Sequence, residues 1–211
     1  MKKTTVMIAL GGNSLSPKGI AGSIEQQFHY TKDTMDGISI FIESGDNICV
    51  THGNGPQVGD ALHRMDLTSD QIPPLPLGVC VAGTQGQMGY MIQQSLQNKL
   101  REMEIDREVV TMVTQVIVDR NDKSLKNPTK YIGPRYSEGE ILKKSENFNW
   151  TIKEQEPGLW RRVVPSPMPE YIMHGKSIKA LVDRGTIVIA FGGGGIPVYN
   201  DKRNRIQGLD A

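Results

Sequence analysis

Three short β-rich runs that each end in a cluster of glycines constrain the fold of this chain most strongly. Each run together with its glycines covers, in turn, residues 5–12, 47–59 and 186–195. The first and third runs are almost continuously apolar, which predicts strands buried on both faces of a parallel sheet. Glycine accounts for 23 of the 211 residues, above its usual share of about 7%. The position of these glycines is therefore the most informative property of the sequence.

Helical patterns fill the segments between these runs. A capping box at 23–26 opens a helix whose apolar stripe continues until Gly45. A second helix is predicted over 84–103, followed by a strand over 109–118. A short helix that stops at Gly185 precedes the third glycine-ended run. Strands that alternate with helices in this way predict an α/β fold with a mainly parallel sheet.

The segment 119–169 interrupts this alternation. It is polar, contains six of the 12 prolines and shows no sustained hydrophobic period. A structureless loop of this length is unusual inside a compact domain. We therefore expect one domain over 1–211 that carries a small inserted, protruding subdomain at 119–169.

Charge and cysteine content exclude several classes of protein. Lysine and arginine number 24 against 23 acidic residues, a net charge of +1, which argues against nucleic acid or a membrane as partner. Cys49 and Cys80 are too few for a disulfide framework and lack metal-ligand spacing. The apolar run 6–10 is too short for a signal peptide or a membrane span. We expect a soluble, cytoplasmic protein.

The glycine clusters predict an anion site. Ligands of an open parallel sheet bind beyond the carboxyl ends of its strands. Glycine lets backbone N–H groups approach an anion closely, and a following helix N-terminus adds a favourable dipole. A single Gly-Gly after a strand is most often a tight turn. Three clusters in equivalent positions favour a phosphate-binding site assembled from separate segments.

The familiar nucleotide and zinc motifs are absent from the sequence. There is no G-x-x-x-x-G-K-[ST], and Gly53, Gly55 and Gly59 are wrongly spaced for G-x-G-x-x-G. No segment looks like the catalytic loops of protein kinases. The four histidines form no H-E-x-x-H, which argues against a zinc hydrolase. We assign no metal-binding residue.

Five motifs, in order along the whole chain, resemble those of carbamate kinases, members of the amino acid kinase family. They are Gly-Gly-Asn at 11–13, THGNGPQVG at 51–59, Asn-Pro-Thr-Lys at 127–130, RRVVPSP at 161–167 and GGGGIPV at 192–198. The resemblance implies an open αβα sandwich with a protruding subdomain. It also implies reversible phosphoryl transfer between ATP and carbamate, with Mg²⁺, run from carbamoyl phosphate and ADP towards ATP in arginine breakdown. A homodimer is implied as well.

The resemblance also implies which residues form the site. Lys130 would reach from the subdomain as the catalytic cation, although it is one of several lysines in a polar segment. The residues expected to bind substrate or phosphate are Gly11, Gly12, Asn13, Gly53, Asn54, Gly55, Gly193 and Gly194.

Three further polar residues have competing interpretations. We interpret His52 as a structural hydrogen-bonding residue, because phosphoryl transfer to an anion removes no proton. Arg161 and Arg162 either contact substrate from the subdomain or form a surface pair, and we favour the structural role.

The resemblance predicts that more polypeptide should follow residue 211. In carbamate kinases this point leads into a Lys-Asp pair and the nucleotide-binding part. We therefore expect a C-terminally truncated sandwich with an uncovered apolar edge, and no ATP formation by these 211 residues alone. The alternatives are a non-catalytic remnant that binds the substrate anion or dimerises, and another phosphotransferase of the amino acid kinase family.

Overall fold

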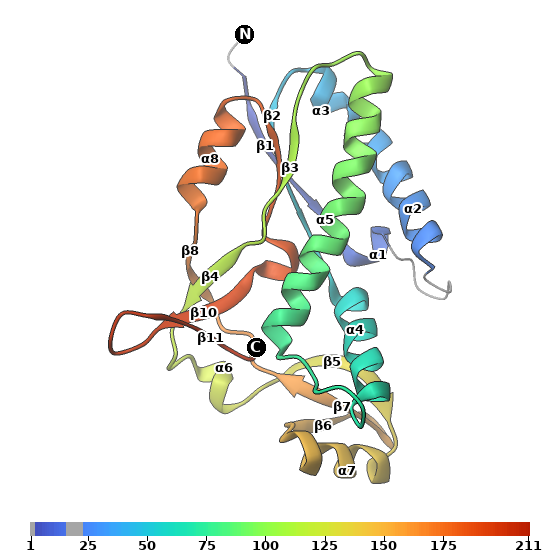
Figure 1. The fold of residues 1–211 in the computed structure, drawn as a ribbon, viewed down its shortest axis with the longest axis vertical. Helices are drawn as coiled ribbons and strands as arrows, with labels where there is room; N and C mark the ends of the chain where they lie inside the picture. The colour runs from blue at the N-terminus through green and yellow to red at the C-terminus, as the bar shows by residue number, and fades with distance from the viewer. Residues whose placement is uncertain (1–2, 16–22) are drawn as a thin grey trace. The chain divides into compact units, whose positions relative to one another are not determined.

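A computed structural model describes residues 3–15 and 23–211 of the chain (Figure 1). The chain divides into two units, and we describe each by itself. Unit 1 comprises Met1–Pro56, Val81–Gln115 and Ile172–Ile196. Unit 2 comprises Gln57–Cys80, Val116–Tyr171 and Pro197–Ala211.

Unit 1 is built on a parallel sheet in the order β1-β2-β9-β3. Its strands are β1 (Thr5–Leu10), β2 (Asn47–His52), β9 (Ile187–Ile189) and β3 (Val109–Thr111). In the register of the sheet, Leu10 lies opposite His52 and Val50 lies opposite Ile189. The carboxyl ends of the three strands that precede glycine clusters therefore meet at one edge of the sheet.

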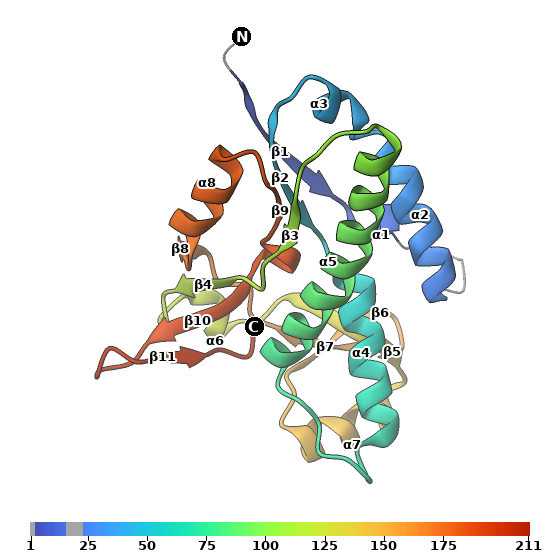
Figure 2. The ribbon, with the colours of Figure 1, turned by 45° about the horizontal axis from the view of Figure 1, so that its top comes forward.

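Helices cover both faces of this sheet. On one face α2 (Ile24–Asp36), α3 (Ser39–Glu43) and α5 (Leu77–Glu102) enclose an apolar core that includes Ile48 and Ile187. On the other face α8 (Gly175–Asp183) packs over the inner strands. Figure 2 shows α2 and α5 side by side, with the sheet between them and α8. The α/β layering with a parallel sheet confirms the fold class predicted from the sequence.

Unit 2 consists mainly of antiparallel strands with short helices. One sheet has the order β5-β7-β6 and another the order β11-β10-β4-β8. The strands are β4 (Gln115–Val118), β5 (Lys130–Tyr136), β6 (Ile152–Glu156), β7 (Leu159–Val164), β8 (Pro169–Ile172), β10 (Ile196–Asn200) and β11 (Ile206–Gly208). The helices are α4 (Gly55–Thr68), whose first two residues belong to unit 1, α6 (Lys123–Lys126) and α7 (Glu138–Phe148). The short helix α1 (Gly12–Leu15) and the 3₁₀ turn η1 (Gly192–Gly194) belong to unit 1. The segment 119–169 thus has secondary structure of its own, and its role as an inserted subdomain stays a prediction.

The structure corrects two predicted helices. The helix expected over 23–45 begins with the predicted capping box but ends at Asp36. Gly37 interrupts it, since glycine has a low helix propensity, and α3 continues the buried stripe. The helix expected from residue 84 begins at Leu77, whose N–H donates to the Asp210 carboxylate at 2.8 Å. That partner is remote in sequence, so this contact could not be predicted from the neighbouring residues.

The structure also corrects two predicted strands. The strand expected over 109–118 is divided into β3 and β4, which pair in different sheets. Thr114 lies between them and donates its N–H to the Gln85 side chain, so this N–H is not available to a strand partner. The run 5–10 was predicted to be buried on both faces, but Thr5, Met7 and Ala9 are exposed because β1 lies at the sheet edge. The third run is buried as predicted in β9.

Among the residues that the structure describes, no helix is both long and apolar enough to cross a membrane.

Candidate functional site

The first two glycine clusters touch each other in unit 1. The Gly53 N–H, directly after β2, donates to the Leu10 carbonyl oxygen at 2.8 Å. A Cβ added to Gly53 would lie 2.9 Å from the Gly12 backbone nitrogen, a separation that real Cβ atoms do not adopt. A Cβ on Gly12 would lie 3.2 Å from Cδ of Pro56. Only glycine at position 53 permits this close approach of two backbones.

The third cluster packs against the second. A Cβ on Gly192 would lie 2.5 Å from Cε1 of the His52 ring. A Cβ on Gly193 would overlap the side-chain amide of Asn54, and Gly193 also has a positive φ of 64°. The structure therefore brings Gly12, Gly53 and Gly193 together with Asn54 at the carboxyl edge of the parallel sheet.

Thr84 fixes the orientation of Asn54. The Asn54 side chain is buried, and its Nδ2 donates to Oγ1 of Thr84 at 2.9 Å. The Thr84 hydroxyl in turn donates to the Val81 carbonyl oxygen at 2.8 Å. A hydroxyl has one proton, and Thr84 donates it to Val81. Oγ1 of Thr84 can therefore only accept from Asn54, so the NH₂ end of the Asn54 amide faces Thr84. Sequence reasoning treated Thr84 only as a helix start and missed this role.

Gln85 anchors the third glycine cluster. Its side chain is 1% exposed, and Nε2 donates to the Gly192 carbonyl oxygen at 2.8 Å and to the Thr114 carbonyl oxygen at 3.3 Å. Its Oε1 accepts the Thr114 N–H at 2.8 Å. The Thr114 hydroxyl accepts the Phe191 N–H at 3.2 Å. Gln85 and Thr114 were also missed, because a polar residue in a helical pattern shows no sign of a partner far along the chain.

His52 is held as a neutral ring. Burial lowers the pKa of His52, and the nearby Gly53 carbonyl opposes this effect without cancelling it. Nδ1 lies 3.1 Å from that carbonyl oxygen, which assigns the proton of the neutral ring to Nδ1. This geometry supports a structural role for His52 in shaping the loops.

Apart from Gly11, whose carbonyl carbon lies 3.9 Å from the position of a Cβ added to Gly53, the other predicted site residues lie outside this cluster of contacts. Gly55 opens α4, and both Gly55 and Gly194 have open space where a Cβ would stand. Gly11 is exposed after β1. Asn13 belongs to α1, but its side chain lies outside the described part of the chain. Lys130 is an exposed residue that begins β5 in unit 2, so it is not among the residues that unit 1 brings together.

Both arginines of the RRVVPSP motif have partners within unit 2. Arg161 donates to the Gly133 carbonyl oxygen at 2.8 Å. Arg162 pairs with Asp210 at 2.7 Å and lies over the Trp150 ring at 5.2 Å. These contacts support the structural role that the sequence favoured for the pair.

The glycine clusters suit an anion better than a metal ion. The segments 10–14, 52–59 and 191–195 contain no acidic side chain. Within residues 3–15 and 23–211, no group of three or more histidine, cysteine, aspartate or glutamate side chains could hold a metal. Backbone N–H groups and the dipole at the start of α4 remain as the binding groups, and these stabilise negative charge.

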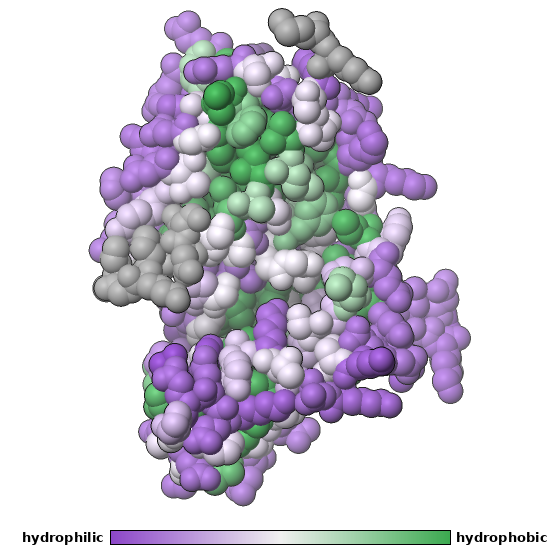
Figure 3. All heavy atoms as spheres, turned by 180° about the vertical axis from the view of Figure 1, so that it is seen from behind, coloured by the Kyte–Doolittle hydropathy of each residue, from purple (hydrophilic) through white to green (hydrophobic). Residues whose placement is uncertain are grey.

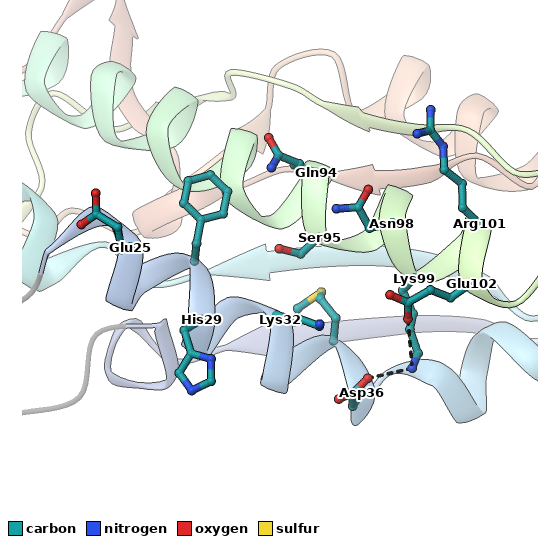
Figure 4. A pocket seen from close by; sticks show the side chains of 12 residues that line it. Glu25, His29, Lys32, Asp36, Gln94, Ser95, Asn98, Lys99, Arg101 and Glu102 are labelled. Atoms are coloured by element: carbon teal, nitrogen blue, oxygen red, sulfur yellow. Dashed lines mark hydrogen bonds and ion pairs between the residues drawn. The ribbon is translucent and has the colours of Figure 1, made fainter.

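A cavity that no residue of the glycine clusters lines lies in unit 1. It has a volume of about 530 Å³ and is lined by residues of α2 and α5, including Phe28, Met35 and Ser95 (Figure 4). At its rim Lys99 pairs with Asp36 at 2.7 Å and lies 4.0 Å from Glu102. Lys99 is therefore paired with acidic residues of both helices.

Comparison with known proteins identifies the family. Carbamate kinase from Pyrococcus furiosus is 45% identical over 208 residues, which is 98% of this chain and 66% of that protein. The carbamate kinase-like protein YahI of Escherichia coli is 42% identical over 213 residues, 99% of this chain and 67% of that protein. The chain belongs to the carbamate kinase family. No protein-family model matches the chain.

Solved carbamate kinase structures agree with this membership. The structure of carbamate kinase from Giardia lamblia bound to AMP-PNP matches with a TM-score of 0.91 and 35% identity, covering 100% of this chain and 66% of that chain. The same enzyme bound to citric acid matches with a TM-score of 0.88 and 35% identity, covering 100% and 68%. The chain thus spans about two thirds of the length of the carbamate kinases that it matches.

Proposed function

We propose that this chain forms the substrate-binding part of a carbamate kinase, which transfers a phosphoryl group reversibly between ATP and carbamate. The observation that carries the proposal is the meeting of three glycine clusters at the carboxyl edge of one parallel sheet. Membership of the carbamate kinase family supplies the identity of the substrate.

The backbone of the clusters would bind the transferring group. N–H groups at Gly11, Gly12 and Gly55 are fixed by the strands and helices on which they lie, so they need no reorganisation as charge develops. The Gly53 N–H is bound to the Leu10 carbonyl oxygen, so Gly53 contributes through the close packing of the two loops. Close packing of Gly53 on Gly12 holds two of these segments in fixed register. The buried Asn54 amide adds a polar group without adding negative charge.

The chemistry requires positioning more than acid–base catalysis. An oxygen of carbamate attacks the γ-phosphorus in line; the bond from phosphorus to the ADP oxygen breaks, and a bond to the carbamate oxygen forms. The transition state is loose and spreads charge over the phosphoryl oxygens. No proton moves in this step, which agrees with a buried, neutral His52 that acts on loop structure alone.

Lys130 is the proposed catalytic cation. It is exposed at the start of β5, directly after the Asn-Pro-Thr segment of its motif. A lysine at the end of a flexible stem can follow the charge of a phosphoryl group as it moves between two oxygens.

Nucleotide, metal and assembly belong to the proposal as well. ATP and ADP are the proposed co-substrates, and AMP-PNP in the Giardia lamblia relative supports nucleotide use. Mg²⁺ commonly binds through nucleotide phosphates and water; no described residue group of this chain fits a metal site of its own. A cytoplasmic homodimer that serves arginine breakdown is proposed from the family resemblance.

The proposal is tested in an extended chain, in which the C-terminal third of Pyrococcus furiosus carbamate kinase follows Ala211. We expect this protein to form ATP from ADP and carbamoyl phosphate in a luciferase assay. Lys130→Ala should lower kcat/KM by roughly 100-fold or more, while Lys126→Ala, an exposed lysine of the same segment, should not. An extended chain that unfolds cooperatively but forms no ATP would contradict the proposal. Equal kinetics of Lys130→Ala and Lys126→Ala would contradict the role of Lys130.

A further inference from the structure

Gln57 is a buried side chain whose hydrogen-bonding capacity is unused. It is 4% exposed, yet its amide nitrogen Nε2 and its amide oxygen Oε1 both lack a hydrogen-bond partner among the described residues. Among the side chains that the structure describes, no other amide has both ends buried and unpartnered. A buried polar group without a partner costs free energy, so this amide requires an explanation.

The position of Gln57 makes the lack of partners unusual. Asn54 precedes α4 and Gln57 is the third residue of that helix, which is the spacing of a capping box. Both α2 and α7 close a box of this kind, at 23–26 and 137–140. At the start of α4 the Asn54 amide donates to Thr84 instead, and the Gln57 side chain bonds to neither residue. The first turn of α4 therefore keeps an amide that is free to bind a ligand.

This amide belongs to the same turn as the proposed anion-binding N–H groups of α4. Side chains of a helix are directed towards its N-terminus, so the Gln57 side chain runs back along the first turn. Gly55 and Pro56 of that turn are exposed, and no atom lies within 4 Å of the position of a Cβ added to Gly55. Rotation of the Gln57 amide towards this open space breaks no hydrogen bond. A ligand held at the start of α4 can therefore be met by the amide.

Selectivity for carbamate requires a hydrogen-bond acceptor, because this substrate carries an amino group beside its carboxylate. The backbone N–H groups of the glycine clusters only donate, so they suit phosphoryl oxygens and not an amino group. Hydrophobic side chains, which gather over the sheet of unit 1 in Figure 3, offer neither donor nor acceptor. The unpartnered Oε1 of Gln57 supplies the missing acceptor.

We propose that Gln57 recognises the carbamoyl end of the substrate. Its Oε1 accepts from the substrate amino group, and its Nε2 donates to the neighbouring substrate oxygen, so that both ends of the amide are satisfied. This role of Gln57 deepens the proposed function, on which it rests. In acetyl phosphate a methyl group of similar size replaces the amino group of carbamoyl phosphate, and Oε1 would then be left without a donor. A site built to bind an N–H group discriminates against such an analogue.

Calorimetric titration of the 211-residue chain with carbamoyl phosphate, acetyl phosphate and inorganic phosphate tests this role. We expect the parent chain to bind carbamoyl phosphate at least about 10-fold more tightly than acetyl phosphate. In Gln57→Met the affinity for carbamoyl phosphate should fall until the preference is less than about 2-fold, while inorganic phosphate binds as it does to the parent chain. Gln94→Met, at an exposed glutamine of α5, is the matched control and should keep the preference.

The parent chain alone already decides the question, whether or not Gln57→Met folds. Equal affinity of the parent chain for carbamoyl phosphate and acetyl phosphate would overturn the recognition by Gln57 and leave the proposed function standing. An equal loss of affinity for all three ligands in Gln57→Met would also overturn it, since Gln57 would then act on loop shape alone. Absence of saturable binding of all three ligands would reject the proposed function itself, and the role of Gln57 with it.

Discussion

The side-chain amide of Gln85 donates a 2.8 Å hydrogen bond to the carbonyl oxygen of Gly192, 107 residues away in sequence. The same side chain binds both backbone polar groups of Thr114. One buried amide therefore joins α5, the segment after β3 and the third glycine cluster.

Gln85→Met removes this connection at nearly constant volume. Three hydrogen bonds are lost, and the Thr114 N–H is left without a partner, whereas the carbonyl oxygens of Thr114 and Gly192 keep the N–H groups of Ile196 and Gly195. The loss should lower the free energy of unfolding by roughly 3 kcal/mol and the melting temperature by about 6–12 °C. Thermal unfolding followed by circular dichroism measures the change. Gln57→Met is the control: Gln57 is equally buried, but its amide atoms have no hydrogen-bond partner among the described residues. Equal losses in the two variants would contradict the anchoring role.

Gly193→Ala should destabilise the third cluster. Position 193 has a positive φ, which costs an L-residue roughly 1–2 kcal/mol, and the methyl group would overlap the Asn54 amide. Gly83→Ala is the matched control, because Gly83 lies within α5 with open space around its Cβ position. That variant should gain about 0.5–1 kcal/mol. Denaturant unfolding of both variants measures the free energy of unfolding. An unchanged value for Gly193→Ala would show that the loop does not pack as described.

Stability should fall as the solution is acidified from pH 7.5 to 5.5. Burial depresses the pKa of His52 in the folded chain, so the unfolded chain binds more protons over this range. The free energy of unfolding therefore rises with pH. The contribution of His52 is fully present above the unfolded pKa of about 6.5 and is lost as the pH drops below it. Melting temperatures of His52→Gln should depend less on pH than those of the exposed-site variant His63→Gln. Identical pH profiles of the two variants would show that His52 is not the cause of the lost stability.

Lys144 should stabilise unit 2 through Asp66. The Asp66 side chain is 5% exposed, with the Lys144 ammonium at 2.5 Å and the Tyr136 hydroxyl at 3.0 Å. Burial, with Asp66 adding to it, raises the pKa of Tyr136, so that hydroxyl remains a donor. Lys144→Met should cost about 2 kcal/mol, because a buried carboxylate would lose its only cation among the described residues. Lys143→Met on the exposed side of α7 should change stability by less than about 0.5 kcal/mol; urea titrations that show no difference would contradict the pairing.

Local signals predicted the elements that frame the site. The apolar runs before the glycine clusters became β1, β2 and β9, and the capping box at Ser23 marked the start of α2. These features depend on neighbours within a few residues, which is why they can be read directly. The start of α5 could not be predicted from neighbouring residues, because the first N–H of this helix donates to Asp210, which is remote in sequence.

The contacts that shape the site could not be predicted from the sequence for the same reason. Thr84, Gln85 and Thr114 act through partners that only the folded chain brings near. The exposure of Met7 likewise depends on where α8 packs, which the TVMIAL run does not encode. The glycine patterns thus predicted where the loops lie. The residues that hold the loops in place, and the exposed face of β1, could be identified only from the structure.

Binding of carbamoyl phosphate to the 211-residue chain tests the central claim most directly. Isothermal titration calorimetry should show saturable binding of one anion per chain, with inorganic phosphate competing for it. Gly55→Ala places a methyl group in the open space at the start of α4 without strain and should weaken binding by roughly 10-fold or more, while Gly83→Ala should bind like the parent chain. Absence of saturable binding, or equal affinity of the two variants, would contradict a substrate site at the glycine clusters.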